Sequence, residues 1–200
     1  MGEVWRSWGG VLVVWAVAVP VLAGAAVWGV RLRVRHGRPY HRALRMTLGE
    51  VGVLGGTLPW VWMILTPRDA PGGVNLVPFR DIVQTLAGPP SAAVVQVAAN
   101  LVVFVPLGFC LPLRVPRLAG VRRMLALGAA VSAALEAAQY AFDLGRVASV
   151  DDVVMNATGA ALGAAALAVA RAGSAARRVR RARRSSSAVF AGTRASSRSS

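Results

Sequence analysis

Five long apolar runs constrain this chain more than any other feature of its sequence. The first, residues 8–30, has no charged residue in 23 positions, which is enough to cross about 30 Å of hydrocarbon as a helix. The others are residues 46–66, 92–113, 124–142 and 150–170. Only helices and closed barrels satisfy their backbone in lipid, and runs of this length are typical of helices. We therefore predict an all-α membrane protein, a bundle of about five transmembrane helices.

Composition supports this class. Charged residues make up 16% of the chain, against about a quarter in a typical soluble domain, and the mean hydropathy is +0.55. Every basic residue is arginine, an actinobacterial-like composition. Six arginines follow the first run, whereas Arg6 alone precedes it beside Glu3, so we expect an uncleaved anchor rather than a signal peptide. With one cysteine and two histidines, we expect no metal site and no cofactor.

The arginines also predict an orientation in the plasma membrane. Six lie in residues 31–45, four in residues 114–123 and nine after residue 170, whereas the other two loops are nearly balanced in charge. Basic and balanced loops therefore alternate across five spans. By the positive-inside rule the N-terminus lies outside and the C-terminus in the cytoplasm.

Three regions follow from this pattern. Residues 1–45 form an N-terminal transmembrane anchor and an arginine-rich cytoplasmic loop, and residues 46–170 form a four-helix membrane domain. Residues 171–200 have too little apolar content to fold alone, so we expect a disordered basic tail. The tail's arginines would attract anionic lipid, and because topology and lipid contact explain the charge we expect no nucleic-acid partner.

Polar residues in three of the runs lie at one depth. Asn100, Glu136 and Asn156 each lie about six residues inside the outer end of their run, which at 1.5 Å per residue is roughly 9 Å below the surface. Gln139 is one turn closer to the outside, on the face of Glu136. Because buried polar groups in lipid are costly, we expect these side chains to meet, forming the floor of a pocket in the outer leaflet.

Simpler interpretations stand beside the pocket. Ser149 and Asp152 have the spacing of a capping box, and acidic residues such as Asp151 favour a helix N-terminus. Asn100 could simply join two helices. A carboxylate at the depth of Glu136 needs a partner or a proton, which favours a functional role. The sequence thus leaves Asp151 and Asp152 as helix caps, as the rim of the pocket, or as both.

The loop between the second and third runs holds a further element. After Pro78, apolar and polar residues alternate with helical spacing, which predicts a short amphipathic helix on the outer surface. The apolar residues are Phe79, Ile82, Val83 and Leu86, and the polar residues are Arg80, Asp81, Gln84 and Thr85. This interfacial helix could cover the polar cluster or serve only in packing.

Four sequence blocks resemble the VanZ-like family, which is named for an accessory protein of glycopeptide-resistance clusters. They are "NLVPF" (75–79), "NLVVFVPLGF" (100–109), "EAAQ" (136–139) and "GRVASVDDVVMNATGAALG" (145–163). The resemblance covers residues 47–170. The chain departs from the family pattern at Ser149, where we would place an acidic residue, and at Ala148, where we would place an aromatic one. The resemblance implies a link to teicoplanin resistance without a settled molecular activity.

Two functions of different classes follow. In the first, the protein binds an envelope lipid or lipid-linked cell-wall component at the outer leaflet without catalysis. Arg80 and Arg146 would pair with an anionic head group, and Asn75, Asn100, Gln139 and Asn156 would bond its polar parts. In the second, Glu136, Asp151 and Asp152 carry out acid–base chemistry on such a lipid. No recognisable nucleophile or phosphate-binding motif accompanies these acids, so whether the protein is an enzyme stays open. A proton-coupled transporter is the weaker third reading.

Overall fold

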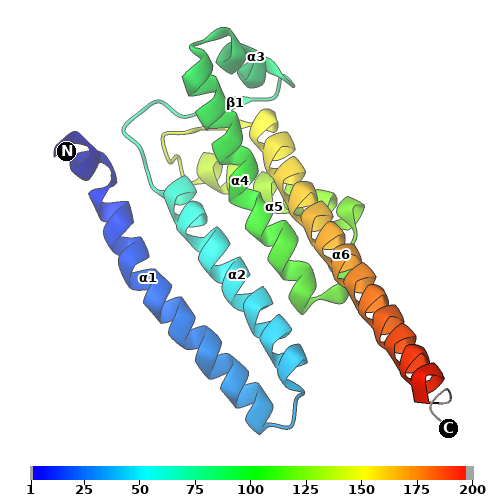
Figure 1. The fold of residues 1–200 in the computed structure, drawn as a ribbon. Coiled ribbons are helices and arrows are strands. Elements are labelled where there is room, and N and C mark those ends of the chain that lie inside the picture. Colours follow the sequence, from blue (N-terminus) through cyan, green and yellow to red (C-terminus); the bar gives the residue numbers. More distant parts are fainter. Residues whose placement is uncertain (1, 197–200) are drawn as a thin grey trace. The chain divides into compact units, whose positions relative to one another are not determined.

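The computed structural model describes the backbone of residues 2–196 and the side chains of residues 16–90, 93–94 and 97–177. Almost all of it is helical (Figure 1). The elements in chain order are α1 (Gly2–Arg35), α2 (Tyr40–Leu65), β1 (Gly73–Asn75), α3 (Arg80–Ala87), α4 (Pro90–Arg114), the 3-10 turn η1 (Pro116–Leu118), α5 (Val121–Ala141), β2 (Val147–Ser149) and α6 (Val150–Ser196).

Five of the helices are long and apolar enough to cross a membrane. Within the described residues these segments are Ala16–Arg35, Tyr40–Leu65, Val97–Arg114, Val121–Ala141 and Val150–Arg177. Their number and order confirm the all-α membrane fold class. The second begins six residues before the apolar run at Met46, because the residues between Tyr40 and Arg45 continue the same helix.

The core lies where α4, α5 and α6 pack together. Its buried apolar side chains are Val103, Phe104, Leu107, Met124, Ala160 and Ala164. Glycine permits this packing, because a methyl group on Gly108 would overlap the backbone of Ala160 and one on Gly159 would overlap that of Leu101. Close backbone approach through small residues is a common way for helices to associate in lipid. Gly163 lies one turn after Gly159 on the same face of α6, and a methyl group on it would likewise overlap Val105.

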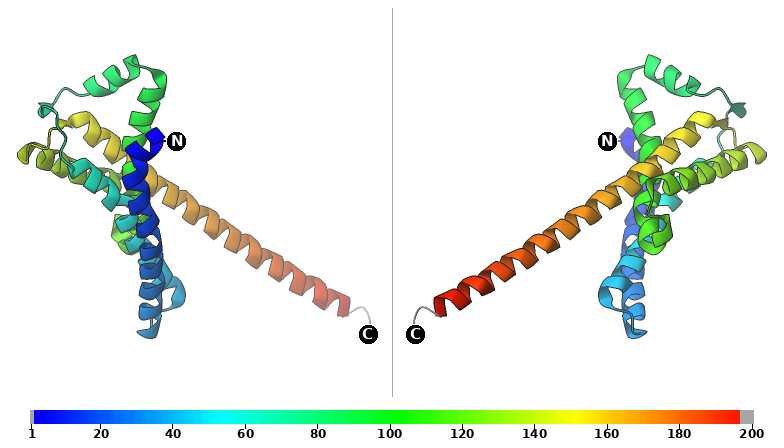
Figure 2. Two further views of the ribbon diagram at one scale, coloured as in Figure 1. Left: turned by 90° about the vertical axis from the view of Figure 1, so that its left-hand side faces the viewer. Right: turned by 90° about the vertical axis from the view of Figure 1, so that its right-hand side faces the viewer.

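A short parallel strand pair joins the two loops at one end of the bundle. β1 pairs with β2 in the register Gly73–Val147, Val74–Ala148 and Asn75–Ser149. This brings the loop after α2 against the loop after α5. We call the region of β1, β2, α3 and the adjoining helix ends the β1–β2 end; it lies opposite the turn between α1 and α2 (Figures 1 and 2).

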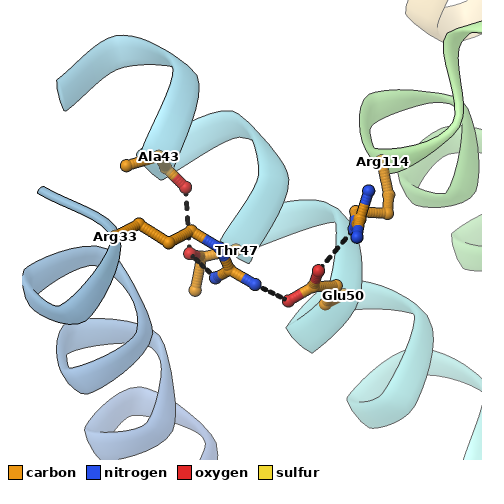
Figure 3. A network of polar contacts seen from close by, with 5 residues as sticks. All are labelled: Arg33, Ala43, Thr47, Glu50 and Arg114. Atoms are coloured by element: carbon orange, nitrogen blue, oxygen red, sulfur yellow. Dashed lines mark hydrogen bonds and ion pairs between the residues drawn. The ribbon is translucent and has the colours of Figure 1, made fainter. Parts of the chain in front are cut away.

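At the opposite end, one carboxylate joins three helices (Figure 3). Glu50 of α2 forms ion pairs of 2.5 Å with Arg33 of α1 and 2.5 Å with Arg114 of α4. Arg33 also donates to the Thr47 hydroxyl, which in turn donates to the Ala43 carbonyl oxygen. The single acidic residue of α2 is therefore neutralised by arginines on both neighbouring helices.

The chain divides into two units, Met1–Ala165 and Ala166–Ser200. In the second unit the described residues continue α6 as helix to Ser196. The expectation that residues 171–200 form a disordered basic tail stays a prediction. Arginine, serine and alanine dominate residues 171–200, and of these arginine and alanine are strong helix formers.

Candidate functional site

The buried carboxylate of Asp151 holds the start of α3. Its oxygens accept hydrogen bonds from the backbone amides of Phe79 (2.5 Å), Asp81 (2.9 Å) and Ile82 (3.1 Å). The first amides of a helix have no partner within it, and a negative charge at that end is favourable. Asp151 is itself in the first turn of α6. The acidic cap predicted for α6 therefore serves mainly a different helix.

Phe79 shows what this cap stabilises. It precedes the first residue of α3 with a φ of 63°, in the left-handed region that a bulky residue rarely adopts. Its amide donates to Asp151, and the amide of Val83 donates back to the Phe79 carbonyl oxygen at 2.9 Å. The tight entry into α3 thus depends on a carboxylate more than 70 residues later in the chain.

Ser149 lies at the junction of β2 and α6 and links three elements. Its hydroxyl accepts from the Asp151 amide (3.2 Å), as an N-cap does, and donates to the Asp81 carboxylate of α3 (2.5 Å). Its own amide donates to Glu136 of α5 (3.0 Å). In a capping box the acceptor of this amide is the side chain three positions later, which here would be Asp152. In this protein Glu136 of α5 is the acceptor instead.

Asp81, like Ser149, belongs to this cluster although it was not among the predicted site residues. Besides the Ser149 hydroxyl, its carboxylate accepts from the Asn75 amide group at 2.6 Å. The Asn75 side-chain oxygen accepts in turn from the Val77 amide, which fixes the turn into α3. In sequence, Asp81 was only one of four polar positions on a short helix, and its place depends on the β1–β2 pairing.

Asp152 links the start of α6 to α4. It accepts a hydrogen bond of 2.8 Å from the side-chain amide of Asn100. It also lines a hollow of about 260 Å³ whose polar walls include Asp81, Thr85 and Ser149. The sequence placed Asn100 and Asp152 near one another, and the structure brings them into direct contact.

Glu136 borders a different and largely apolar hollow of about 440 Å³. Ser149 lies in the wall of both hollows and so separates them. Asn156 borders neither: it is buried and donates to the Ser132 hydroxyl of α5 at 2.8 Å. The single pocket floored by Asn100, Glu136 and Asn156 is thus replaced by two hollows and one helix-to-helix hydrogen bond.

Gln139 and Arg146 donate hydrogen bonds to the C-terminal end of α2. Gln139 donates to the Ile64 carbonyl oxygen (3.1 Å), and Arg146 donates to those of Met63 (2.6 Å) and Thr66 (3.3 Å). The last carbonyl groups of a helix lack partners within it, so these contacts complete α2. Partial burial, and then the charge of Arg68, lower the pKa of Arg146, but a guanidinium stays protonated at neutral pH.

The remaining predicted site residue, Arg80, has an exposed side chain at the start of α3. Of the predicted set, the structure therefore gathers Asn75, Asn100, Glu136, Asp151 and Asp152 around Ser149 and Asp81. Among the residues that the structure describes, no group of three or more His, Cys, Asp or Glu side chains is placed to hold a metal ion.

Comparison with known proteins gives one match. The family model described as VanZ/LLP1 matches residues 55–171, more than half of the chain. This range contains every residue of the cluster at the β1–β2 end, whereas α1 and the Arg33–Glu50 pair precede it. No curated protein and no solved structure matches the chain.

Proposed function

Because the chain belongs to the VanZ/LLP1 family, we propose that its β1–β2 end binds an envelope lipid or a lipid-linked cell-wall component in the outer leaflet of the plasma membrane. One observation carries this proposal. The two hollows flank Ser149 at the ends of membrane-spanning helices, and both have carboxylates in their walls: Glu136 in the larger hollow, and Asp81 and Asp152 in the smaller one. The larger hollow is mostly apolar and the smaller one more polar, and an apolar site with a few placed polar groups beside it suits a small amphiphile.

The orientation that this requires is supported by the arginines. The α1–α2 turn, the α4–α5 connection and the C-terminal segment carry most of them, which favours the cytoplasmic side for these parts. The N-terminus and the β1–β2 end then lie outside. The arginines after residue 170 would contact anionic lipid of the inner leaflet.

The helix α3 would lie at the outer interface. Phe79, Val83 and Leu86 have exposed fractions of 59%, 62% and 64%, while Asp81 faces the protein. An amphipathic helix with an exposed apolar face is stabilised by burying that face among lipid head groups. This arrangement would place the hollows directly beneath a lipid surface.

The family's link to teicoplanin resistance suggests the consequence of binding, a lower susceptibility to glycopeptides that act on lipid-linked cell-wall material.

A second function is an acid–base reaction on the bound lipid. Glu136 and Asp152 would serve it because both border a hollow. Asp151 would not, because it is fully buried and its oxygens hold three backbone amides.

Susceptibility of cells to teicoplanin and vancomycin tests the proposal. Wild type, Glu136→Gln and Asp152→Asn are expressed at matched membrane levels, with Asp69→Asn as the control because Asp69 is an exposed acid of the α2–β1 loop. We expect protection by wild type and the control, and loss of protection with either hollow variant. Full protection by both hollow variants would make these carboxylates structural groups only.

A further inference from the structure

The hollow beside Glu136 has a shape and position suited to part of a lipid molecule. It lies between β1, α5 and the start of α6, and its apolar wall includes Val74, Leu76, Ala133, Ala137, Val150 and Val153. Its volume of about 440 Å³ falls within the roughly 300–1,000 Å³ of typical small-molecule sites. Glu136 is five residues from the end of α5, which is about 8 Å at the helical rise of 1.5 Å. A lipid molecule in the surrounding membrane would therefore reach the hollow.

The charges around the hollow favour a cation. Glu136 accepts the Ser149 amide through one oxygen, Oε2, and borders the hollow. Across Ser149 lie the carboxylates of Asp81 and Asp152. The described lining residues of the Glu136 hollow include no Arg, Lys or His. Arg146, whose charge acts on Glu136, does not line this hollow and donates its hydrogen bonds to the carbonyl oxygens of α2.

Tyr140 places an aromatic ring in the wall of the Glu136 hollow. It lies one turn beyond Glu136 on the same face of α5, lines the hollow, and has an exposed fraction of 64%. Tyrosine favours the boundary between lipid chains and head groups, and an aromatic face also attracts ammonium groups. The polar end of a bound amphiphile would therefore lie between Tyr140 and Glu136.

We propose that this hollow binds an amine-bearing amphiphile, with the ammonium group donating to Glu136 and the hydrocarbon arm lying against α5 and α6. The proposal rests on the proposed lipid-binding function. At this hollow it replaces the anionic head group, which Arg80 and Arg146 were expected to hold, with a cationic one. An ammonium group offers three donors to the carboxylate, whereas a phosphate group would meet only negative charge in this wall.

The test is a titration of the purified full-length protein with three probes of one chain length, dodecylamine, dodecanol and dodecyl phosphate, followed by native mass spectrometry at pH 7. We expect dodecylamine to bind most tightly. Glu136→Gln keeps the size of the side chain and an acceptor for Ser149, and should weaken dodecylamine binding by about tenfold, the scale of one hydrogen bond to a charged group, while leaving dodecanol unchanged.

Two further variants separate the hollow from the helix surface. Ala137→Phe fills the hollow and should weaken all three probes, whereas Ala134→Phe makes the same change at an exposed position of α5 outside it and should weaken none. Equal binding of dodecanol or dodecyl phosphate, or no effect of Glu136→Gln, would overturn the amine proposal and leave lipid binding standing. Failure of all three probes to saturate would overturn both.

Discussion

The carboxylate of Asp151 accepts the backbone amide of Phe79 at 2.5 Å, across 72 positions of the chain. Asp81 and Ile82 donate to the same carboxylate, so one side chain of α6 accepts three of the backbone amides at the start of α3. This contact explains why a fully buried acid is placed at the end of a membrane-spanning helix. It also gives the first prediction.

Asp151→Asn should loosen α3 without unfolding the bundle. An amide has one acceptor oxygen where the carboxylate has two, and its NH₂ group would face backbone donors. Leaving buried donors unpaired costs about 1–3 kcal/mol. Hydrogen–deuterium exchange should therefore rise across residues 79–87 and stay unchanged in the α4–α6 core. Asp69→Asn is the control, and unchanged exchange at Ile82 in Asp151→Asn would contradict this assignment.

Gly159→Ala should lower the thermal stability of the protein. The added methyl group would overlap the Leu101 backbone, so α4 and α6 would have to separate, and overpacking of this kind costs about 1–3 kcal/mol. Gly24→Ala is the matched control because nothing lies within 4 Å of the corresponding position. The melting temperature of detergent-solubilised protein should fall for the first variant alone. Equal melting temperatures would mean that the two helices are not in close contact.

The Glu50 network should contribute modestly to stability. Arg33, Glu50 and Arg114 are all partly exposed, with Glu50 at 32%, and such ion pairs contribute only about 0.2–1 kcal/mol each. A double-mutant cycle between Arg33→Gln and Glu50→Gln should return a coupling energy in this range from thermal unfolding. A coupling energy of zero would mean that the contact between α1 and α2 is stabilised by apolar packing alone.

Cysteine labelling should report the orientation. In a Cys110→Ala background, a cysteine at Ala70, in the exposed loop after α2, should react in intact cells with a reagent that does not cross membranes. A cysteine at His36, in the turn after α1, should react only after the cells are opened. This follows from the excess of arginine around His36. The reverse pattern would place the β1–β2 end in the cytoplasm.

The spans were predictable because each depends on its own stretch of sequence. A run of apolar residues must be helical in lipid whatever surrounds it, so their number and order followed directly. Gly159 and Gly163 are a local pattern of the same kind, because small residues four apart lie on one helical face and permit close contact with a neighbouring helix. Local patterns of this kind predict structure without knowledge of the rest of the fold.

The partners of the polar residues were not predictable in the same way. Depth alone indicated that Asn100, Glu136 and Asn156 lie at one level, but not which face of each helix they occupy. Asn156 meets Ser132 inside the α5–α6 contact, whereas Asn100 meets Asp152. The strands β1 and β2 have only three residues each, too few for an alternating pattern, and their pairing is what brings Asp81 to Ser149.

The dependence of α3 on Asp151 has a consequence for biosynthesis. A membrane protein is made from its N-terminus, so the segment that becomes α3 leaves the ribosome about 70 residues before the side chain that anchors it. Until the last span has been inserted, the amides at the start of α3 lack their acceptor. The β1–β2 end is therefore assembled last, and a chain that stops before α6 would have all its earlier spans and no finished site.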